Sequence, residues 1–412
     1  RCRWCGRLRG TVLRVALTML TLQSNWRYSP PWWLRGGHAQ TIWSARVARH
    51  WPAQSDKLYQ HLSRAGRSTD GGVISGWREP PLPTEFAALV PHWRRERWTT
   101  PDEDFIDVDY LLSTGAALAE PSTHKKTPIV VMFHGLEGSR HSHYAYALAH
   151  ACSARGWGLV IPHFRGCSGE LNLGPRAYHS GDYAEIDWVL RRVANEHPGV
   201  PIVALGYSLG GNALMRWAGE FGVEAGRVVR SVASVCAPLD LVASGQAIGK
   251  GVNKLLYTRM FLASMQPKAK AKWAQYPNLF NLDAALDART ILEFDNAFTA
   301  PVHGFKHVLD YWSRASAKPH MRSIAVPSLV INAKNDPFVP IASVPNQSEV
   351  ADAVTVLHTE EGGHVGFAQP IASRKPPGHI AALPNALLDW FSEHLSLSIT
   401  PTNSPNPTVR PS

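Results

Sequence analysis

The sequence predicts a doubly wound α/β fold, a mostly parallel sheet with helices on both faces, and a helical cap inserted between two late strands. Continuous apolar runs at residues 128–133, 158–162 and 202–205 alternate with stretches of helical periodicity. Such runs are typical of parallel strands that are buried on both faces. The alternation stops after Pro238 and resumes near residue 326. An insertion there is expected to cover the carboxyl ends of the strands, where the sites of such folds lie.

The strands and helices can be assigned in chain order. Residues 94–100 and 105–112 flank a turn at 101–104, and the second run alternates in polarity, which predicts a pair of strands. The turn at 206–210 is expected to lead into a helix that ends near Phe221. The remaining expected strands are residues 128–133, 158–162, 202–205, 228–236, 326–332 and 354–358, and the remaining expected helices are residues 144–155, 182–196 and 380–394.

The expected cap comprises residues 239–319. Residues 255–264 and 307–315 show helical patterns, and Pro267, Pro277 and Pro301 are interpreted as turn signals. A disordered linker is the alternative. The many large aromatic side chains in this stretch argue against it, because such rings are rarely left in water.

The rest of the chain divides by composition. Five Trp side chains lie between Trp26 and Trp51, so this region is expected to pack over the core. The first expected division is a basic N-terminal segment at 1–23, which is disordered or, in residues 1–18, lies upstream of a true start at Met19. The others are a Trp-rich leader at 24–91, a core at 92–238 and 320–396, the cap at 239–319, and a disordered tail rich in Pro, Ser and Thr at 397–412.

The net charge of +10 is concentrated at the N-terminus. Nine arginines precede the first acidic residue, Asp56, so the rest of the chain is nearly neutral. A neutral body predicts no nucleic-acid partner. The basic segment is compatible with contact to an acidic membrane surface, and a solvated arm is the alternative. No apolar run is long enough to predict a transmembrane helix.

Cysteine usage predicts a reducing compartment. The five cysteines are an odd and scattered set, and Cys2-x-x-Cys5 lacks a second pair at metal-ligand spacing. A zinc site is therefore not expected. Few cysteines in a long chain suit the cytoplasm. We expect a cytoplasmic protein, peripheral to the membrane if the basic segment contacts it, with neither a metal nor a cofactor.

The stretch Gly206-Tyr207-Ser208-Leu209-Gly210 connects an expected strand to an expected helix. A G-x-S-x-G turn in this context is typical of a nucleophile elbow, in which a strained turn exposes the serine. Glycines are needed on either side because side chains there would clash. The alternative is a glycine-rich connection that carries an exposed serine without a role.

A serine nucleophile needs a base within hydrogen-bond reach and a carboxylate that orients the base. His364 follows the expected strand 354–358 in a glycine-rich loop, and Asp336 follows the expected strand 326–332. Together with Ser208 they have the chain order Ser, Asp, His that this kind of site requires. A loop histidine and a turn or N-cap aspartate without a catalytic role are the alternatives.

Other residues compete for these roles. Asp240 follows the expected strand 228–236 and is the rival acid, whereas His379 and His394 lie on or beside the last expected helix and are weaker candidates for the base. Oxyanion stabilisation needs two backbone N–H groups. Leu209 and Leu136 are the candidates, and a plain glycine turn is the alternative at the second position. His134 is expected to brace that loop.

The chain resembles the α/β-hydrolase superfamily, and within it the YheT-like esterase and lipase branch. Eukaryotic members of that branch are the abhydrolase-domain lipases and the yeast medium-chain ethyl-ester acyltransferases. The resemblance covers residues 27–395. It rests on seven sequence motifs: GGHAQT at 36–41, HGLEGS at 134–139, FRGCSGE at 164–170, YHSG at 178–181, GYSLGGN at 206–212, NDPF at 335–338 and GGHVGF at 362–367.

The resemblance implies that Ser208, Asp336 and His364 form a catalytic triad, without a cofactor. It also implies hydrolysis of carboxylic esters, with short- and medium-chain acyl esters and monoacylglycerols as substrate classes. We therefore expect a serine carboxylesterase or lipase that acts on a small ester or lipid. Acyl transfer to an alcohol by the same residues is one alternative, and product analysis with added ethanol would reveal it. A non-catalytic ligand-binding protein is the other, and it would fail to react with a fluorophosphonate.

Overall fold

The computed structural model describes residues 28–50, 91–112, 127–370, 376 and 378–395. The expected segments 1–23 and 397–412, together with Cys2 and Cys5, lie outside the described residues, as does most of the Trp-rich leader. The division of the chain into domains stays a prediction. None of the helices in the described segments combines the length and the apolar composition needed to cross a bilayer.

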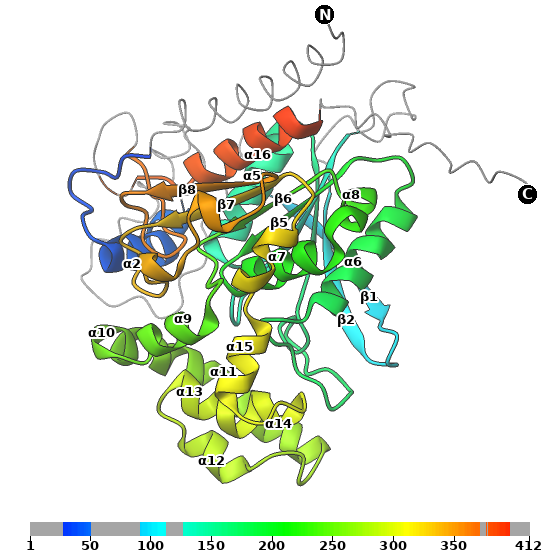
Figure 1. Ribbon diagram of the computed structural model, residues 1–412, viewed down its shortest axis with the longest axis vertical. Coiled ribbons are helices and arrows are strands. Elements are labelled where there is room, and N and C mark those ends of the chain that lie inside the picture. The colour runs from blue at the N-terminus through cyan, green and yellow to red at the C-terminus, as the bar shows by residue number, and fades with distance from the viewer. Residues whose placement is uncertain (1–27, 51–90, 113–126, 371–375, 377, 396–412) are drawn as a thin grey trace, which may run out of the picture.

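An eight-stranded sheet forms the centre of the described structure (Figure 1). The strand order is β1-β2-β4-β3-β5-β6-β7-β8. The pairs β1–β2 and β2–β4 are antiparallel, and the other pairs are parallel. The strands are β1 (His92–Thr99), β2 (Phe105–Leu112), β3 (Ile129–Phe133), β4 (Gly158–Pro162), β5 (Ile202–Tyr207), β6 (Ser231–Val235), β7 (Ser328–Ala333) and β8 (Val354–Thr359). The predicted doubly wound sheet is thus confirmed.

Helices cover both faces of the sheet because successive side chains of each strand point to opposite faces. In β3, Val130 and Met132 pack against α5 (His143–Arg155) and α16 (Ala382–Leu395). The residues between them, such as Val131, belong to the opposite cluster, which includes side chains of α6, α7 and α8. Those helices are α6 (Tyr183–Glu196), α7 (Leu209–Phe221) and α8 (Ala225–Val228). Burial on both faces explains why the inner strands read as unbroken apolar runs.

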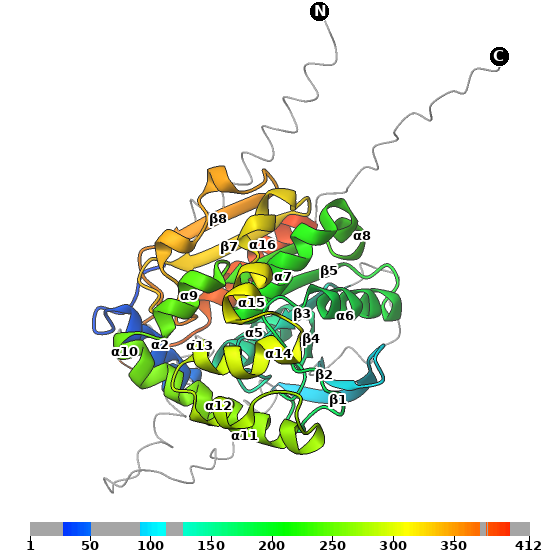
Figure 2. The same ribbon diagram turned by 60° about the horizontal axis from the view of Figure 1, so that its bottom comes forward.

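A helical cap lies between β6 and β7 and contains a hydrophobic cluster of its own. It projects from one end of the sheet (Figures 1 and 2). Its elements are α9 (Leu241–Ile248), α10 (Gly251–Asn253), the π-helical turn η3 (Lys254–Thr258), α11 (Arg259–Gln275), α12 (Leu282–Asp287), α13 (Ile291–Phe294), η4 (Asp295–Thr299), α14 (Ala300–Val302) and α15 (Val308–Ala315).

Three local predictions are wrong. Pro301 was expected to mark a turn, but it lies in α14, where it stands in the first turn. Pro267 was expected to mark a turn, but it lies inside α11. Its neighbours on the same helix, Leu262 and Met265, are buried in the cap cluster, and this packing outweighs the hydrogen bond that a proline removes. The strand expected from residue 228 begins instead at Ser231, because Val228 is the last residue of α8.

The sequence also did not predict α2 (Gly37–Arg46). The buried residues of this helix are polar, namely Gln40, Thr41 and Ser44. Helix prediction depends on apolar residues that recur with helical spacing on the buried face. A helix that buries polar groups lacks that signal.

Candidate active site

Ser208 lies in the sharp turn between β5 and α7, with φ 52° and ψ −120°. This backbone conformation is strained for a residue with a side chain, at a cost of about 1–3 kcal/mol. The flanking glycines make the turn possible. A Cβ on Gly206 would lie 2.5 Å from the Gly210 carbonyl oxygen, and a Cβ on Gly210 would lie 2.5 Å from the carbonyl oxygen of Phe133. The turn therefore requires the motif read from the sequence.

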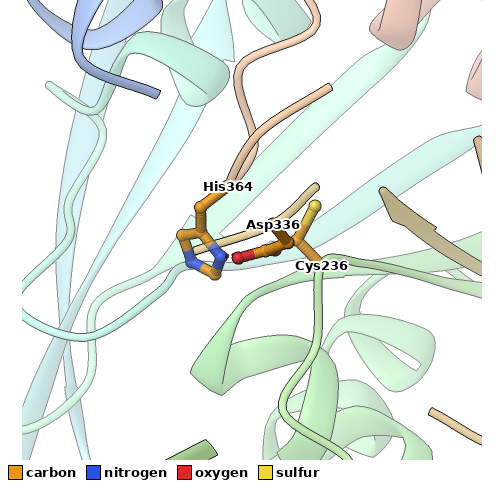
Figure 3. Close-up of side chains that lie close together, drawn as sticks. All are labelled: Cys236, Asp336 and His364. Atoms are coloured by element: carbon orange, nitrogen blue, oxygen red, sulfur yellow. Dashed lines mark hydrogen bonds and ion pairs between the residues drawn. The ribbon is translucent and has the colours of Figure 1, made fainter. Parts of the chain in front are cut away.

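The structure brings the three sequence-predicted residues into one chain of hydrogen bonds. Ser208 Oγ lies 2.9 Å from His364 Nε2, and His364 Nδ1 lies 2.9 Å from Asp336 Oδ2. The Asp336 carboxylate is completely buried and points toward the imidazole ring (Figure 3). Its other oxygen accepts hydrogen bonds from the backbone N–H groups of Phe338 and Val339, at 2.7 and 3.2 Å. The carboxylate is thus held in place from both sides.

The rival residues make other contacts. Asp240 is the N-cap of α9, where its Oδ1 accepts a hydrogen bond from the backbone N–H of Ala243. His379 accepts one from the backbone N–H of Ala381, and His394 Nδ1 lies 2.9 Å from the carbonyl oxygen of Trp390. None of these contacts joins a rival residue to Ser208 or to His364.

Cys236 lies beside the acid and base, and with them it forms a group of potential metal ligands within 4.8 Å of one another. Burial raises the pKa of the Cys236 thiol well above its usual value. A neutral thiol is a poor ligand, because metals bind the thiolate. The sulfur instead accepts a hydrogen bond from the Val365 N–H, at 3.3 Å. The set therefore fits an acid–base pair better than a metal site.

The loop after β3 lies against the elbow. A Cβ on Gly135 would be 3.2 Å from Ser208 Cβ. The N–H of Gly135 donates to the Tyr144 hydroxyl, at 2.9 Å. No hydrogen bond is recorded within the described residues for the N–H of Leu136 or Leu209, and both residues line the cavity that contains Ser208. Two such N–H groups could hold a developing oxyanion.

His134 braces this loop. Its Nδ1 lies 2.8 Å from the Gly135 carbonyl oxygen, and its Nε2 accepts a hydrogen bond from the backbone N–H of Phe164 at 3.0 Å. Burial lowers the pKa of His134 to about 3. The ring is therefore neutral at physiological pH, which matches one donating and one accepting nitrogen.

Glu137 joins the same loop to the cap. Its carboxylate forms an ion pair with Lys268 of α11 at 2.7 Å and also accepts a hydrogen bond from Ser264 of that helix. The hydroxyl of Tyr178 donates to Glu137 Oε1 at 2.8 Å and accepts from the Glu137 N–H at 3.1 Å. This link could not be predicted, because Glu137, Tyr178 and Lys268 are far apart along the chain.

The FRGCSGE motif at 164–170 also has a structural role. Arg165 is almost completely buried, and its guanidinium contacts the carboxylates of Asp102, Asp104 and Glu185 at 2.6–2.9 Å. Such paired charges hold the loop after β4 next to the cavity, which Arg165 also lines.

A cavity of about 150 Å³ opens beside Ser208 and His364 and extends under the cap. A cavity of about this size lined by apolar side chains can hold a benzene-sized group. The cap supplies most of its apolar wall, including Leu241, Phe261, Met265, Phe294, Phe298 and Trp312. The site thus combines a polar reaction centre with a small apolar pocket.

Asp295 in the cavity wall predicts a pH dependence of stability. Burial raises the pKa of Asp295 to about 6, despite hydrogen bonds from Thr299 and Trp312. The folded protein therefore favours the neutral carboxyl. The stability that protonated Asp295 gives the folded state is fully present below the unfolded pKa of about 4, and it is lost as the pH rises through about 6. We expect Asp295→Asn to gain on the order of 3 kcal/mol of unfolding free energy relative to the wild type between pH 4 and pH 7. Denaturant titrations at each pH would measure it.

The control for this prediction is Asp310→Asn. The pKa of Asp310 is lowered, first by the hydrogen bond from the backbone N–H of Lys306. Asp310→Asn should therefore lose unfolding free energy relative to the wild type as the pH rises through the acidic range, the opposite of the change expected for Asp295→Asn. A difference between Asp295→Asn and wild type that does not change with pH would contradict the prediction.

Helix α2 holds together the loops that contain Asp336 and His364. Gln40 is completely buried. Its Oε1 accepts hydrogen bonds from the backbone N–H of Gly362 at 2.9 Å and from Asn335 Nδ2 at 3.0 Å, and its Nε2 donates to Glu361. Thr41 Oγ1 accepts from the backbone N–H of His364 at 2.8 Å. This arrangement gives the GGHAQT phrase a role that the sequence did not reveal.

We expect Gln40→Ala to lower kcat by about 10- to 100-fold with a smaller effect on KM, because misplacing a catalytic group by about 1 Å has effects of this size. Gln347→Ala is a matched control. The Gln347 amide also bonds the backbone, donating to the Val354 carbonyl oxygen and accepting from the Val356 N–H, but at β8 outside the site. Steady-state kinetics below the unfolding temperature of each variant would measure the effect, and equal losses in both would contradict it.

Comparisons with known proteins agree with the observed fold. A family model described as the alpha/beta hydrolase fold matches residues 128–370, a range that contains Ser208, Asp336 and His364. YheT of Escherichia coli (strain K12), described as a candidate esterase, is 39% identical over 291 residues, which cover 69% of this chain and 82% of YheT.

Two eukaryotic proteins are more distant relatives. Phospholipase ABHD3 of Mus musculus is 27% identical over 284 residues, 69% of this chain and 68% of that protein. The medium-chain fatty acid ethyl ester synthase/esterase 2 of Saccharomyces cerevisiae is 27% identical over 267 residues, 58% of each chain.

Proposed function

Because this chain belongs to the α/β hydrolase family, in its esterase and lipase branch, we propose that it is a serine hydrolase that cleaves carboxylic esters through a covalent acyl-enzyme. The observation that carries the proposal is the continuous hydrogen-bonded chain from Ser208 through His364 to Asp336. Each group has the partner that a nucleophile, a base and an orienting acid need.

The proposed reaction has two halves. His364 Nε2 takes the proton of Ser208 as Oγ attacks the ester carbonyl, and Asp336 stabilises the imidazolium that forms. The N–H groups of Leu136 and Leu209 hold the oxyanion of the tetrahedral intermediate. His364 then protonates the departing alcohol. In the second half His364 activates a water that releases the acid from Ser208.

The cavity supports short- to medium-chain acyl groups as substrates. Its apolar wall would bury an acyl chain, and its volume of about 150 Å³ favours short chains in the observed conformation. Monoacylglycerols belong to the proposed class because the resemblance to the YheT-like branch implies them, and the name of ABHD3, a phospholipase, makes a lipid ester a reasonable substrate. Rates on p-nitrophenyl esters of graded chain length should fall steeply once the chain exceeds the cavity.

A fluorophosphonate probe tests the mechanism directly. We expect it to modify Ser208, identified by mass spectrometry of the labelled peptide, and to abolish hydrolysis of p-nitrophenyl butyrate in proportion to labelling. Labelling of another serine with equal loss of activity would overturn the assignment. Absence of both labelling and hydrolysis would favour a ligand-binding protein on the same fold.

Acyl transfer to an alcohol is a second candidate, favoured by the name of the yeast relative, an ethyl ester synthase and esterase. It uses the same acyl-enzyme, and an alcohol replaces water in the second half. Product analysis with added ethanol distinguishes the two, because ethyl ester in excess of free acid would identify a transferase.

A further inference from the structure

We propose that one outer surface of the cap, together with the adjoining side of α2, docks on an anionic lipid surface. This inference goes beyond the proposed chemistry, because it concerns where the protein meets its substrate. We call this surface the outer cap face. It is defined by the exposed apolar residues Ile42, Val252, Leu255, Leu256 and Met260.

The outer cap face is unusual because it exposes the apolar side of a helix. Along α10, η3 and α11 the exposed positions recur every three or four residues, as a single helix face does. Leu255 is 65% exposed and Met260 is 46% exposed. The inward side of the same helices is also apolar, with Tyr257 and Leu262 buried. A helix that is apolar on both sides is usually covered on both.

The neighbouring helix α2 extends this surface. His38 of α2 stacks on Tyr257 with ring centroids 5.8 Å apart, and Arg46 contacts the sulfur of Met260 at 4.0 Å. Ile42 lies on the exposed side of α2, between those two contacts along the helix. The apolar face thus continues from the cap to the N-terminal helix, and α2 and α10 lie close together in both views (Figures 1 and 2).

The charges around the outer cap face favour an anionic partner. Residues 241–282 contain no acidic residue and six basic residues, and Arg46 adds a further cation beside Met260. Two of the six face inward, since Lys268 pairs with Glu137 and Lys272 donates to backbone carbonyl oxygens. The basic residues of this stretch are Lys250, Lys254, Arg259, Lys268, Lys270 and Lys272.

Apolar side chains flanked by cations match the two layers of a membrane interface. Leucine and methionine enter the boundary of the acyl chains, while Lys and Arg remain at the level of acidic headgroups. An acidic protein surface would match the cations but not two adjacent, strongly exposed leucines. A second copy of this chain would face cations with cations. The observations therefore favour lipid over either protein partner.

The position of the surface connects it to the site. The helix that exposes Met260 lines the cavity on its inner side with Phe261 and Met265. The helix that exposes Ile42 holds the His364 loop through Thr41. Docking of the outer cap face would place a lipid ester one helix thickness from the cavity.

Vesicle flotation of the full chain tests the proposal. Ser208→Ala protein is used so that no lipid is consumed, with vesicles of phosphatidylcholine alone or mixed with phosphatidylglycerol. We expect binding to the anionic vesicles, weaker at about 1 M than at about 0.1 M salt because salt screens charges.

The variants test which residues make the contact. Leu255→Glu with Leu256→Glu should weaken binding on the order of 100-fold. Arg259→Gln should weaken binding to anionic vesicles about fivefold. Val223→Glu, at a 74% exposed apolar residue in η2 (Gly222–Glu224), should have no effect.

The outcomes separate this inference from the proposed function. Hydrolysis of a soluble p-nitrophenyl ester by the Leu255→Glu/Leu256→Glu protein, with Ser208 intact, should equal that of wild type, and this also shows that the variant folds. Met260→Glu serves as a second, milder variant. Wild-type binding that these changes do not affect would overturn the proposal. So would absence of vesicle binding, or a dimer that the leucine changes dissociate, because the face would then contact another protein. If the wild-type protein bound the vesicles, with the expected effects of the leucine changes, but did not hydrolyse the soluble ester, the result would count against the proposed function alone.

Discussion

Ser208→Ala is expected to lower kcat/KM for p-nitrophenyl butyrate by about 10⁶-fold, because loss of a serine nucleophile leaves only binding and oxyanion stabilisation. The protein should stay folded. Alanine accepts the same strained backbone at φ 52°, and the change removes one hydrogen bond, to His364. Steady-state kinetics and thermal melts of the same preparations would measure both.

Ser244→Ala is the matched control for this result. Ser244 lines the same cavity and is buried, but its hydroxyl has no hydrogen-bond partner among the described residues. Its loss should change kcat/KM by less than about threefold, since surrounding contacts are kept. If Ser208→Ala retained activity near that of the control, another group would be the nucleophile.

Asp336→Asn is expected to lower kcat by about 10⁴-fold, with KM nearly unchanged. Asparagine fills the same space and can still accept from the Phe338 N–H. It can no longer hold the His364 tautomer that places a free electron pair on Nε2, nor stabilise the imidazolium. The expected loss is therefore chemical and not a failure to fold.

Asp240→Asn separates the two candidate acids. Asparagine is as good an N-cap as aspartate, so α9 should keep its cap and the stability should change little. We expect activity close to wild type. A loss of activity in Asp240→Asn greater than that in Asp336→Asn would show that the rival acid orients the base.

The fold was predictable because its signals are local. Each inner strand is a short apolar run, and the strand, glycine turn and helix around Ser208 follow one another without a gap. The order Ser208, Asp336, His364 could also be predicted, because each residue lies in the connection that follows a strand of a parallel sheet. The sequence could not show their distances. Their catalytic roles stay predictions until the variants are measured.

The cap shows where local reading fails. Pro267 is a turn signal by its own chemistry, and only the packing of its helix against the rest of the cap reverses that expectation. The exposure of the outer cap face likewise depends on how the helices of the cap pack, and not on a local sequence signal. The sequence from 252 to 265 is rich in apolar residues, but only the tertiary structure shows which of them remain in water.

The sequence by itself determined the doubly wound sheet, the strained serine turn and the residues that follow each strand, since these depend on side-chain period and on steric limits over a few residues. Only the tertiary structure decided how the acid and base are held. Gln40 and Thr41 lie about 300 residues before the loops they bind. Their helix buries polar groups, so no hydrophobic period marks it. Its hydrogen bonds exist only once the folded chain brings the two loops beside it.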